Sequence, residues 1–331
     1  MNCRSILVII LLSALLVGCS TGAATEEVQP TTPVEPAGTE PPVEPSATTK
    51  PADTATVTLQ PLTDAIVFTS NRGTDPDKLG LYLLNLETLE VTPIDTGMDG
   101  SILPRWSPDG STILFSVIDI WNLYSIQPNG GGLTRLTDFR SNNADWSPDG
   151  DCLVFQSDHD DEPLNTPDIY IIDIDGTNLV EIQDVPPEVD FSPRWSPDGS
   201  RILFISSMPG ILQPFAVNPD GTGLTMLMND PAGVNVASWS PDGKRIVFAS
   251  GQGDASEIYI VDADGNGSNL VQLTNDAFMD DNPVFSPDGE YIVFSSTRGG
   301  NLDLWTMKVN GTDLVQLTND PYTDSFPDWR Q

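Results

Sequence analysis

Trp106-Ser-Pro-Asp-Gly110 is the stretch that decides the fold, because the chain repeats it. The same five residues return at 146–150, 195–199 and 239–243, with the variant Phe285-Ser-Pro-Asp-Gly289 and a truncated Phe326-Pro-Asp-Trp329. Measured between the aligned aromatic residues, the intervals are 40, 49, 44, 46 and 44 residues. A period of this size is typical of stacked or circular repeats, in which each unit needs its neighbours to bury its faces.

Each repeat has the pattern of four short strands. The first strand ends at the aromatic residue, and Ser-Pro-Asp-Gly then suits a type I turn. An apolar second strand such as Arg201–Ile205 follows, then a loop, a third strand such as Ile169–Asp173, and a tight turn before a fourth strand such as Leu314–Thr318. This pattern predicts a β-propeller blade. We expect the aromatic rings to fill the space between neighbouring blades: Trp106, Trp146, Trp195, Trp239, Phe285 and Trp329.

The two ends of the repeat region complement each other. Residues 65–94 hold a second, third and fourth strand with no aromatic motif before them, and the missing first strand comes last, at Ser325–Trp329. We therefore predict that residues 62–331 form an all-β, six-bladed β-propeller of four-stranded blades. The C-terminal strand would complete the first blade and close the ring.

Five near-identical motifs in register closely resemble the repeats of TolB-type six-bladed propellers. Those repeats carry Trp-Ser-Pro-Asp-Gly, then Ile-x-Phe and a late Ile-Tyr strand, as at Arg245-Ile-Val-Phe-Ala249 and Ile258-Tyr-Ile-Val-Asp262. The resemblance covers residues 62–331. It implies a binding or scaffold protein of the cell envelope that mediates protein–protein interaction, with a role in envelope integrity or transport.

The N-terminal segment predicts export and a tether. Ser5–Val17 is an apolar run of 13 residues after a short basic start, which has the proportions of a signal peptide rather than a membrane span. Leu16-Val-Gly-Cys19 resembles the lipobox of bacterial lipoproteins and implies removal of residues 1–18 and acylation of Cys19; an ordinary secretory signal is the alternative. Residues 19–61, rich in Pro, Thr and Glu, predict a disordered tether. Together these features place the protein outside the cytoplasm, lipid-anchored at the periplasmic face of an outer membrane or at the cell surface.

Composition excludes some functions and disfavours others. With 14 Lys and Arg against 48 Asp and Glu, the formal net charge is −34, so nucleic-acid binding is excluded. The chain has one histidine, His159, and no Gly-x-Ser-x-Gly, phosphate-binding loop, CxxC or HExxH motif, so we expect no enzyme activity. Cys152, the only cysteine within residues 62–331, lies in an apolar strand, where an inert thiol is expected.

Acidic residues recur in the connections from each fourth strand to the next first strand. In a propeller these connections surround one mouth of the central channel, where like charges attract cations or basic partners. Two interpretations stay open: a docking rim for an envelope protein or peptide, or acids that merely suit strand ends and turns. The candidate rim consists of Asp95, Asp99, Asp138, Asp184, Glu188, Asp190, Asp230, Asp276, Asp280, Asp281, Asp320 and Asp324.

No cofactor is required by any of these motifs, but Ca²⁺ is an open alternative. The loop residues Asp158, His159, Asp160 and Asp161 could hold a divalent cation or form a solvated acidic loop. Asp173-Ile-Asp-Gly176 and Asp262-Ala-Asp-Gly265 look like calcium loops, but their register in the repeat predicts hairpin turns. With calcium at the rim or in the 158–161 loop, the alternative function is a calcium-dependent carbohydrate- or cell-wall-binding module.

Overall fold

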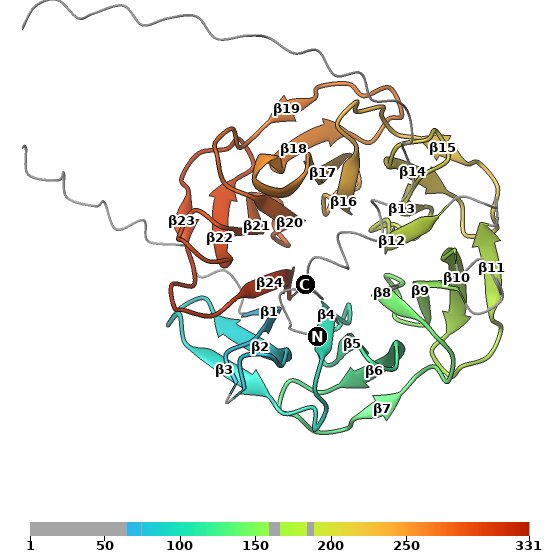
Figure 1. The fold of residues 1–331 in the computed structure, drawn as a ribbon. Coiled ribbons are helices and arrows are strands. Elements are labelled where there is room, and N and C mark those ends of the chain that lie inside the picture. The colour runs from blue at the N-terminus through green and yellow to red at the C-terminus, as the bar shows by residue number, and fades with distance from the viewer. Residues whose placement is uncertain (1–64, 74, 159–165, 184–188, 331) are drawn as a thin grey trace, which may run out of the picture. The chain divides into compact units, whose positions relative to one another are not determined.

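The computed structural model describes residues 65–73, 75–158, 166–183 and 189–330 (Figure 1). Contacts divide the chain into Met1–Thr58 and Leu59–Gln331, and every described residue belongs to the second unit. Within the described ranges the chain forms six four-stranded antiparallel sheets, arranged as blades around a common axis. The predicted six-bladed, all-β propeller is confirmed. Among these residues, no helix has both the length and the apolar character needed to cross a membrane.

Each blade runs outward from an innermost strand, and in four blades the outermost strand has only two residues (Figure 1). The first blade combines β24 (Asp324–Trp329) with β1 (Ala65–Ser70), β2 (Gly80–Asn85) and β3 (Val91–Ile94). The remaining strands are β4 Ser101–Trp106, β5 Ile113–Val117, β6 Asn122–Ile126 and β7 Thr134–Arg135; β8 Asn142–Trp146, β9 Cys152–Ser157, β10 Asp168–Asp173 and β11 Val180–Gln183; β12 Asp190–Trp195, β13 Ile202–Ser206, β14 Gln213–Val217 and β15 Thr225–Met226; β16 Val234–Trp239, β17 Arg245–Ser250, β18 Glu257–Asp262 and β19 Val271–Gln272; β20 Asp280–Phe285, β21 Tyr291–Ser296, β22 Asp303–Lys308 and β23 Val315–Gln316. A 3₁₀ turn, η1, covers Gly253–Ala255.

The Ser-Pro-Asp-Gly motif builds the turn between the first and second strands of a blade. In the copy at 106–110, the Gly110 amide donates to Ser107 O at 2.8 Å. The Ser107 hydroxyl donates to Asp109 Oδ1 at 2.7 Å and accepts from the Thr112 amide at 2.9 Å. Gly110 has a φ of 65°, which glycine adopts at low cost. The serine, the aspartate and the glycine of the motif thus each have a part in the turn, which is consistent with their recurrence.

The aligned aromatic residues pack between blades, as predicted. Trp106 lies in a core cluster with Val67 and Leu81 of the first blade and Phe115 of its own. Trp329, only 1% exposed, packs in the same way against Val293 of the preceding blade. The rings therefore join each blade to its neighbour.

The C-terminal strand closes the ring. β24 pairs antiparallel with β1, with Ile66 opposite Trp329 and Ser70 opposite Asp324. Asp328 Oδ2 also accepts a hydrogen bond from the Trp106 amide at 2.7 Å, so β24 is tied to the second blade as well. The predicted closure is confirmed.

Because the strands of a blade alternate in direction, the links between them fall on two faces. The first, here called the turn face, carries the Ser-Pro-Asp-Gly turns and the hairpins between third and fourth strands. The second, the connection face, carries the loops from second to third strands and the connections from each outermost strand to the next innermost strand. The described members of the candidate rim of acidic residues belong to the connection face.

Candidate functional site on the connection face

Buried polar side chains at the start of the third strands hold the connections in place. Gln213, the first residue of β14, donates from Nε2 to Asp230 O at 2.7 Å and accepts from the Asp230 amide at 2.8 Å. Glu257 has the same position in β18, and its Oε1 accepts from the Asp276 amide at 2.9 Å. These bonds fix the backbone of the connection against its own blade.

An arginine reaches the same region from the loop after β21. Arg298 Nη2 contacts Asp280 Oδ2 at 2.5 Å and Asp276 Oδ2 at 3.3 Å. Its guanidinium carbon lies 5.4 Å from the centre of the Phe294 ring and 5.3 Å from that of Trp305. The arginine side chain is 9% exposed, so it is a buried cation that needs its carboxylate partners.

The neighbouring first blade repeats this arrangement with Arg72. The guanidinium contacts Asp320 at 2.9 Å and forms a close ion pair with Asp324. It lies over the rings of Phe68 and Tyr82 at 5.2 and 5.5 Å. Both arginines lie two residues after the serine that ends the second strand, and a glycine follows each arginine. This pattern is the sequence signal for the two arginines.

The candidate rim divides into three environments rather than forming a uniform ring. The buried members begin the innermost strands: Asp190, Asp280, Asp281 and Asp324. A second group is held by hydrogen bonds or by the two arginines: Asp230, Asp276 and Asp320. The exposed members are Asp95, Asp99 and Asp138, with Asp99 paired to Lys78. Asp184 and Glu188 lie outside the described residues. Whether these acids bind a partner stays a prediction.

Burial weakens the charge of the deep acids. It raises the pKa of Asp281 to about 6, and it also raises the pKa of Asp280 against the opposing effect of Ser296 and Arg298. The pKa of Asp303, at the start of β22, rises to about 6 through burial and the nearby Asp324. The negative potential of this face therefore comes mainly from its exposed carboxylates.

Three exposed acids on this face, Asp75, Asp77 and Asp119, are absent from the candidate rim, and Asp75 Oδ1 accepts a hydrogen bond from the Asp77 amide. Asp77 lies in the loop between β1 and β2, and Asp119 in the loop between β5 and β6. With Asp138 they form a set that we call the exposed acid group. Within the described residues, none of the three carboxylates has a hydrogen-bond or ion-pair partner. These acids could have been predicted from the sequence, because the loops from second to third strands lie on the same face as the predicted connections.

The predicted metal loop is only partly described. Asp158 is 12% exposed, and its Oδ1 pairs with Arg140 Nε at 3.2 Å. His159, Asp160 and Asp161 lie outside the described residues, so this cation site stays a prediction.

The two Asp-x-Asp-Gly segments are hairpin turns, as their register predicted. The Gly176 amide donates to Asp173 O at 2.8 Å, and Asp175 Oδ1 accepts from the Thr177 amide at 2.9 Å. In the other segment, Asp264 Oδ1 accepts from the Asn266 amide at 2.9 Å. Their carboxylates thus serve the turns themselves.

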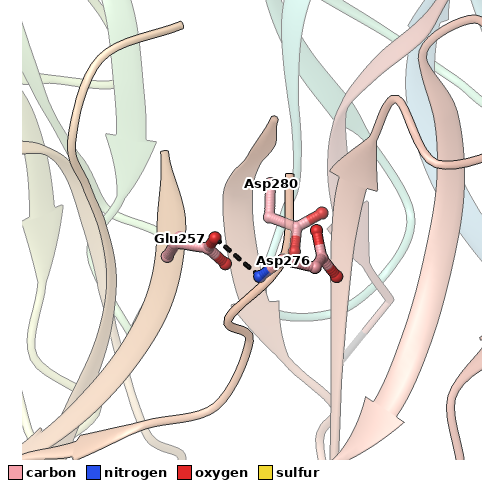
Figure 2. A group of neighbouring side chains, drawn as sticks. All are labelled: Glu257, Asp276 and Asp280. Atoms are coloured by element: carbon pink, nitrogen blue, oxygen red, sulfur yellow. Dashed lines mark hydrogen bonds between the residues drawn. The ribbon is translucent and has the colours of Figure 1, made fainter. Parts of the chain in front are cut away.

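A different set of acids lies close enough together to hold a cation. Glu257 of β18, Asp276 of the β19–β20 connection and Asp280 of β20 each place one carboxylate oxygen within 4.8 Å of the others (Figure 2). Two of the three were in the predicted rim, and Glu257 was missed. Its signal is an acid at the strand position where another blade has Gln213.

A second charged group lies on the innermost strands, at the residue before the aromatic ring. Asp328 and Asp145 each accept a hydrogen bond from the aromatic residue's amide in the next blade, at 2.7 and 2.9 Å. Arg105 and Arg194 stand at the same position in those next blades. Burial raises the pKa of Asp328 to about 6, while burial and the nearby Arg105 lower the pKa of Arg194 to about 9. Sequence reasoning did not single out these four residues, although the repeat alignment places them together.

Cys152, for which an inert thiol was predicted, lies in β9. Its side chain is half-buried, and its thiol lies 3.5 Å from Asp173 Oδ1. Burial, with a further effect of Asp173, raises the pKa of this thiol to about 11. A thiol with so high a pKa holds little thiolate at neutral pH.

Comparison with known proteins agrees with this architecture. Residues 221–331 match the family model described as the TolB beta propeller domain. TolB from Acinetobacter baumannii superposes with a TM-score of 0.69 at 20% identity, over 82% of this chain and 67% of that one. The fold is that of the TolB-type propeller. A putative TolB from Agrobacterium tumefaciens gives a TM-score of 0.61 at 19% identity, over 81% of this chain and 94% of that one.

Two curated relatives match part of this chain. The uncharacterized protein Atu1656 of Agrobacterium fabrum is 31% identical over 105 residues, which is 30% of this chain and 34% of that protein. The uncharacterized peptidase YuxL of Bacillus subtilis is 30% identical over 115 residues, 32% of this chain and 17% of the peptidase. The matched region thus spans at most about a third of either relative, and their activities belong to their own chains.

Proposed function

We propose that this propeller is a binding protein of the cell envelope that docks a basic protein partner on its connection face. The observation that carries the proposal is the exposed acid group, Asp77, Asp119 and Asp138, whose carboxylates have no partner within the described residues. The TolB-type fold supports a protein-interaction role at the level of the family. Fixed like charges on one face attract a basic partner and speed its association.

The face is also held in shape before a partner arrives. The Gly100 amide donates to Leu79 O, and the Ile118 amide donates to Gly100 O, both at 3.0 Å. These bonds link the β1–β2 loop, the β3–β4 connection and the β5–β6 loop into one continuous surface. A surface that is already ordered loses little conformational entropy on binding.

Capture of a partner protein from an envelope extract, with cross-linking, tests the proposal. The test variant is D77K/D119K/D138K, and the control is E87K/E90K/E290K, which reverses three exposed acids on the turn face. The two variants change the net charge equally. We expect wild type and the control to capture the same protein, and the connection-face variant to lose it. Equal capture by all three proteins would reject the connection face as the docking surface.

We further propose that the protein is anchored by lipid on Cys19, outside the cytoplasm. The support is the sequence Leu16-Val-Gly-Cys19 after an apolar run, followed by a Pro- and Thr-rich segment. Cys19→Ser should abolish incorporation of radiolabelled palmitate and release the protein from membranes. Cys152→Ser is the matched control and should leave both unchanged; labelling that survives Cys19→Ser would refute the anchor.

A further inference from the structure

The acids around Arg298 carry more negative charge than this arginine balances. Asp276 and Asp280 pair with Arg298, and Glu257 lies within ligand distance of both aspartates, so the fully ionised group has a net charge of −2. Glu257 is 7% exposed and Asp280 is fully buried. Uncompensated charge in a buried position is costly unless a proton or a cation neutralises it.

Two buried oxygens of this group lack a hydrogen bond of normal geometry, Glu257 Oε2 and Asp280 Oδ1, although the Thr274 hydroxyl lies near both carboxylates. The equivalent Asp324 Oδ1 of the first blade shares this property, so the Glu257 oxygen is the one particular to this site. The other oxygen of Asp280 pairs with Arg298, and the other oxygen of Glu257 accepts a hydrogen bond from the Asp276 amide. Figure 2 shows the Glu257 carboxylate directed at the connection that carries Asp276, beside Asp280. The unpartnered oxygens therefore belong to one small cluster rather than to separate places in the blade.

We propose that Glu257, Asp276 and Asp280 form a calcium site on the connection face. Calcium accepts carboxylate oxygens at about 2.3–2.6 Å, so it can bridge oxygens up to about 5 Å apart. The spacing of 4.8 Å or less in this group lies within that reach. Magnesium, at about 2.0–2.1 Å, bridges only about 4 Å and demands stricter geometry. A divalent cation would also neutralise the excess charge of −2.

The equivalent positions in two other blades show what is particular to this one. The preceding blade has Gln213, Asp230 and Val234, a set with one carboxylate. The first blade, completed by β24, has Arg72 with Asp320 and Asp324, and the position of Glu257 is taken by Asp303 of the adjacent blade.

In the set around Arg72, the side chain of Asp303 is one methylene shorter than that of glutamate. Its Oδ2 accepts a hydrogen bond from Gln316 Nε2 at 3.0 Å. Among the described residues, a group of three acids within ligand distance occurs only at Glu257, Asp276 and Asp280. The longer side chain of Glu257 explains the difference.

Solvent reaches the site through Asp276, whose side chain is 34% exposed. A bound ion would join β18, the β19–β20 connection and β20, which meet here. We therefore expect calcium to stabilise the propeller, whether or not a protein partner docks on the same face. Stabilisation by a ligand that binds only the folded state follows from mass action.

The test measures calcium binding by the purified protein after treatment with a chelator. Isothermal titration calorimetry and the melting temperature are recorded with CaCl₂ and with MgCl₂. Terbium is a further probe, because Trp305 lies over Arg298 and is near enough to sensitise its luminescence. We expect a rise in melting temperature with calcium, a smaller one with magnesium, and terbium emission that calcium displaces.

Glu257→Gln is the decisive variant, because it reproduces the side chain that already works at position 213. It should fold, keep its melting temperature in chelator, and lower calcium affinity at least about tenfold. Asp303→Asn, at the equivalent position of the adjacent blade, should keep wild-type affinity. Calcium affinity unchanged by Glu257→Gln, or no binding by wild type at millimolar calcium, would overturn the site. Should Glu257→Gln fail to fold, Asp276→Asn, at the most exposed member of the site, gives the same two readings, because Asp280 remains to pair with Arg298.

Discussion

At the scale of single residues, we expect the aromatic side chains between blades to contribute strongly to stability. Trp239 is 6% exposed and packs against Leu203 and Ala216 of the preceding blade as well as Phe248 of its own. Trp239→Ala should lower the free energy of unfolding by about 3–5 kcal/mol, because the cavity touches two blades. Trp121→Ala, in a partly exposed loop position, is the control. Denaturant titration measures both, and a loss below about 1 kcal/mol for Trp239→Ala would contradict inter-blade packing.

Asp281 should make stability depend on pH. Burial raises its folded pKa to about 6, above the ordinary value of 3.8, so the fold favours the protonated form. The protonated carboxyl of Asp281 contributes its full stabilisation below about pH 4. This contribution, up to about 3 kcal/mol, is lost as pH rises through about 6. Asp281→Asn should therefore flatten the dependence of unfolding free energy on pH between about 4 and 7. Urea titrations at several pH values test this, and an unchanged slope would refute it.

The pKa of Asp109 is shifted in the opposite direction, so this residue serves as the comparison. The Ser107 hydroxyl and the Ser111 amide lower its pKa to about 2, so its contribution is present above pH 4 and lost as pH falls. Asp109→Asn should reduce stability at neutral pH and leave the behaviour of Asp281 intact. A neutral-pH stability equal to wild type would show that the turn does not depend on the ionised carboxylate.

At the scale of strands, closure by β24 is the feature on which the ring depends. Removal of residues 324–331 takes away the pairing with β1, the ring of Trp329 and the bond from Asp328 to the second blade. We expect the whole propeller to melt at a lower temperature, in one cooperative transition, rather than to fray at one blade. A chain that starts at Leu59 lacks the separate N-terminal unit and should melt like the full protein. A truncated chain with an unchanged melting temperature would contradict closure.

The strands could be predicted because each repeat states the same pattern several times. The Ser-Pro-Asp-Gly motif predicted the positions of the turns. The strands within 65–94, which have no first strand before them, predicted that the C-terminal strand closes the ring. The predicted fourth strand at Leu314–Thr318 was too long, since β23 covers only Val315–Gln316. An outermost strand pairs on one side alone, so its ladder ends sooner than the apolar pattern does.

The candidate site was only partly predictable, because sequence shows residue type and not depth. The sequence predicted both Asp138 and Asp281 in connections of the rim, but Asp138 is exposed, whereas Asp281 lies in β20 and is 6% exposed with a raised pKa. The arginines that neutralise Asp276 and Asp320 come from loops of other strands, so their pairing needs the fold. Glu257 was missed for the same reason, since its neighbours are 19 and 23 positions away in the sequence.

At the scale of the whole molecule, the charge distribution connects the fold to function. The deep acids hold the connections and are partly neutralised by Arg72, Arg298 or raised pKa values. The exposed acid group remains charged at the surface. Binding through such charges should weaken with added salt, because ions screen exposed charges over about 10 Å at moderate ionic strength.

The most direct measurement is the dissociation constant for the captured protein as a function of salt. Wild type, D77K/D119K/D138K and the turn-face control E87K/E90K/E290K are compared at low and at moderate ionic strength. We predict that the connection-face variant binds at least about tenfold more weakly than the control at low salt, mainly through slower association. The difference should shrink as salt rises. Equal affinities for the two variants, or a wild-type affinity that salt does not change, would contradict docking on the acidic connection face.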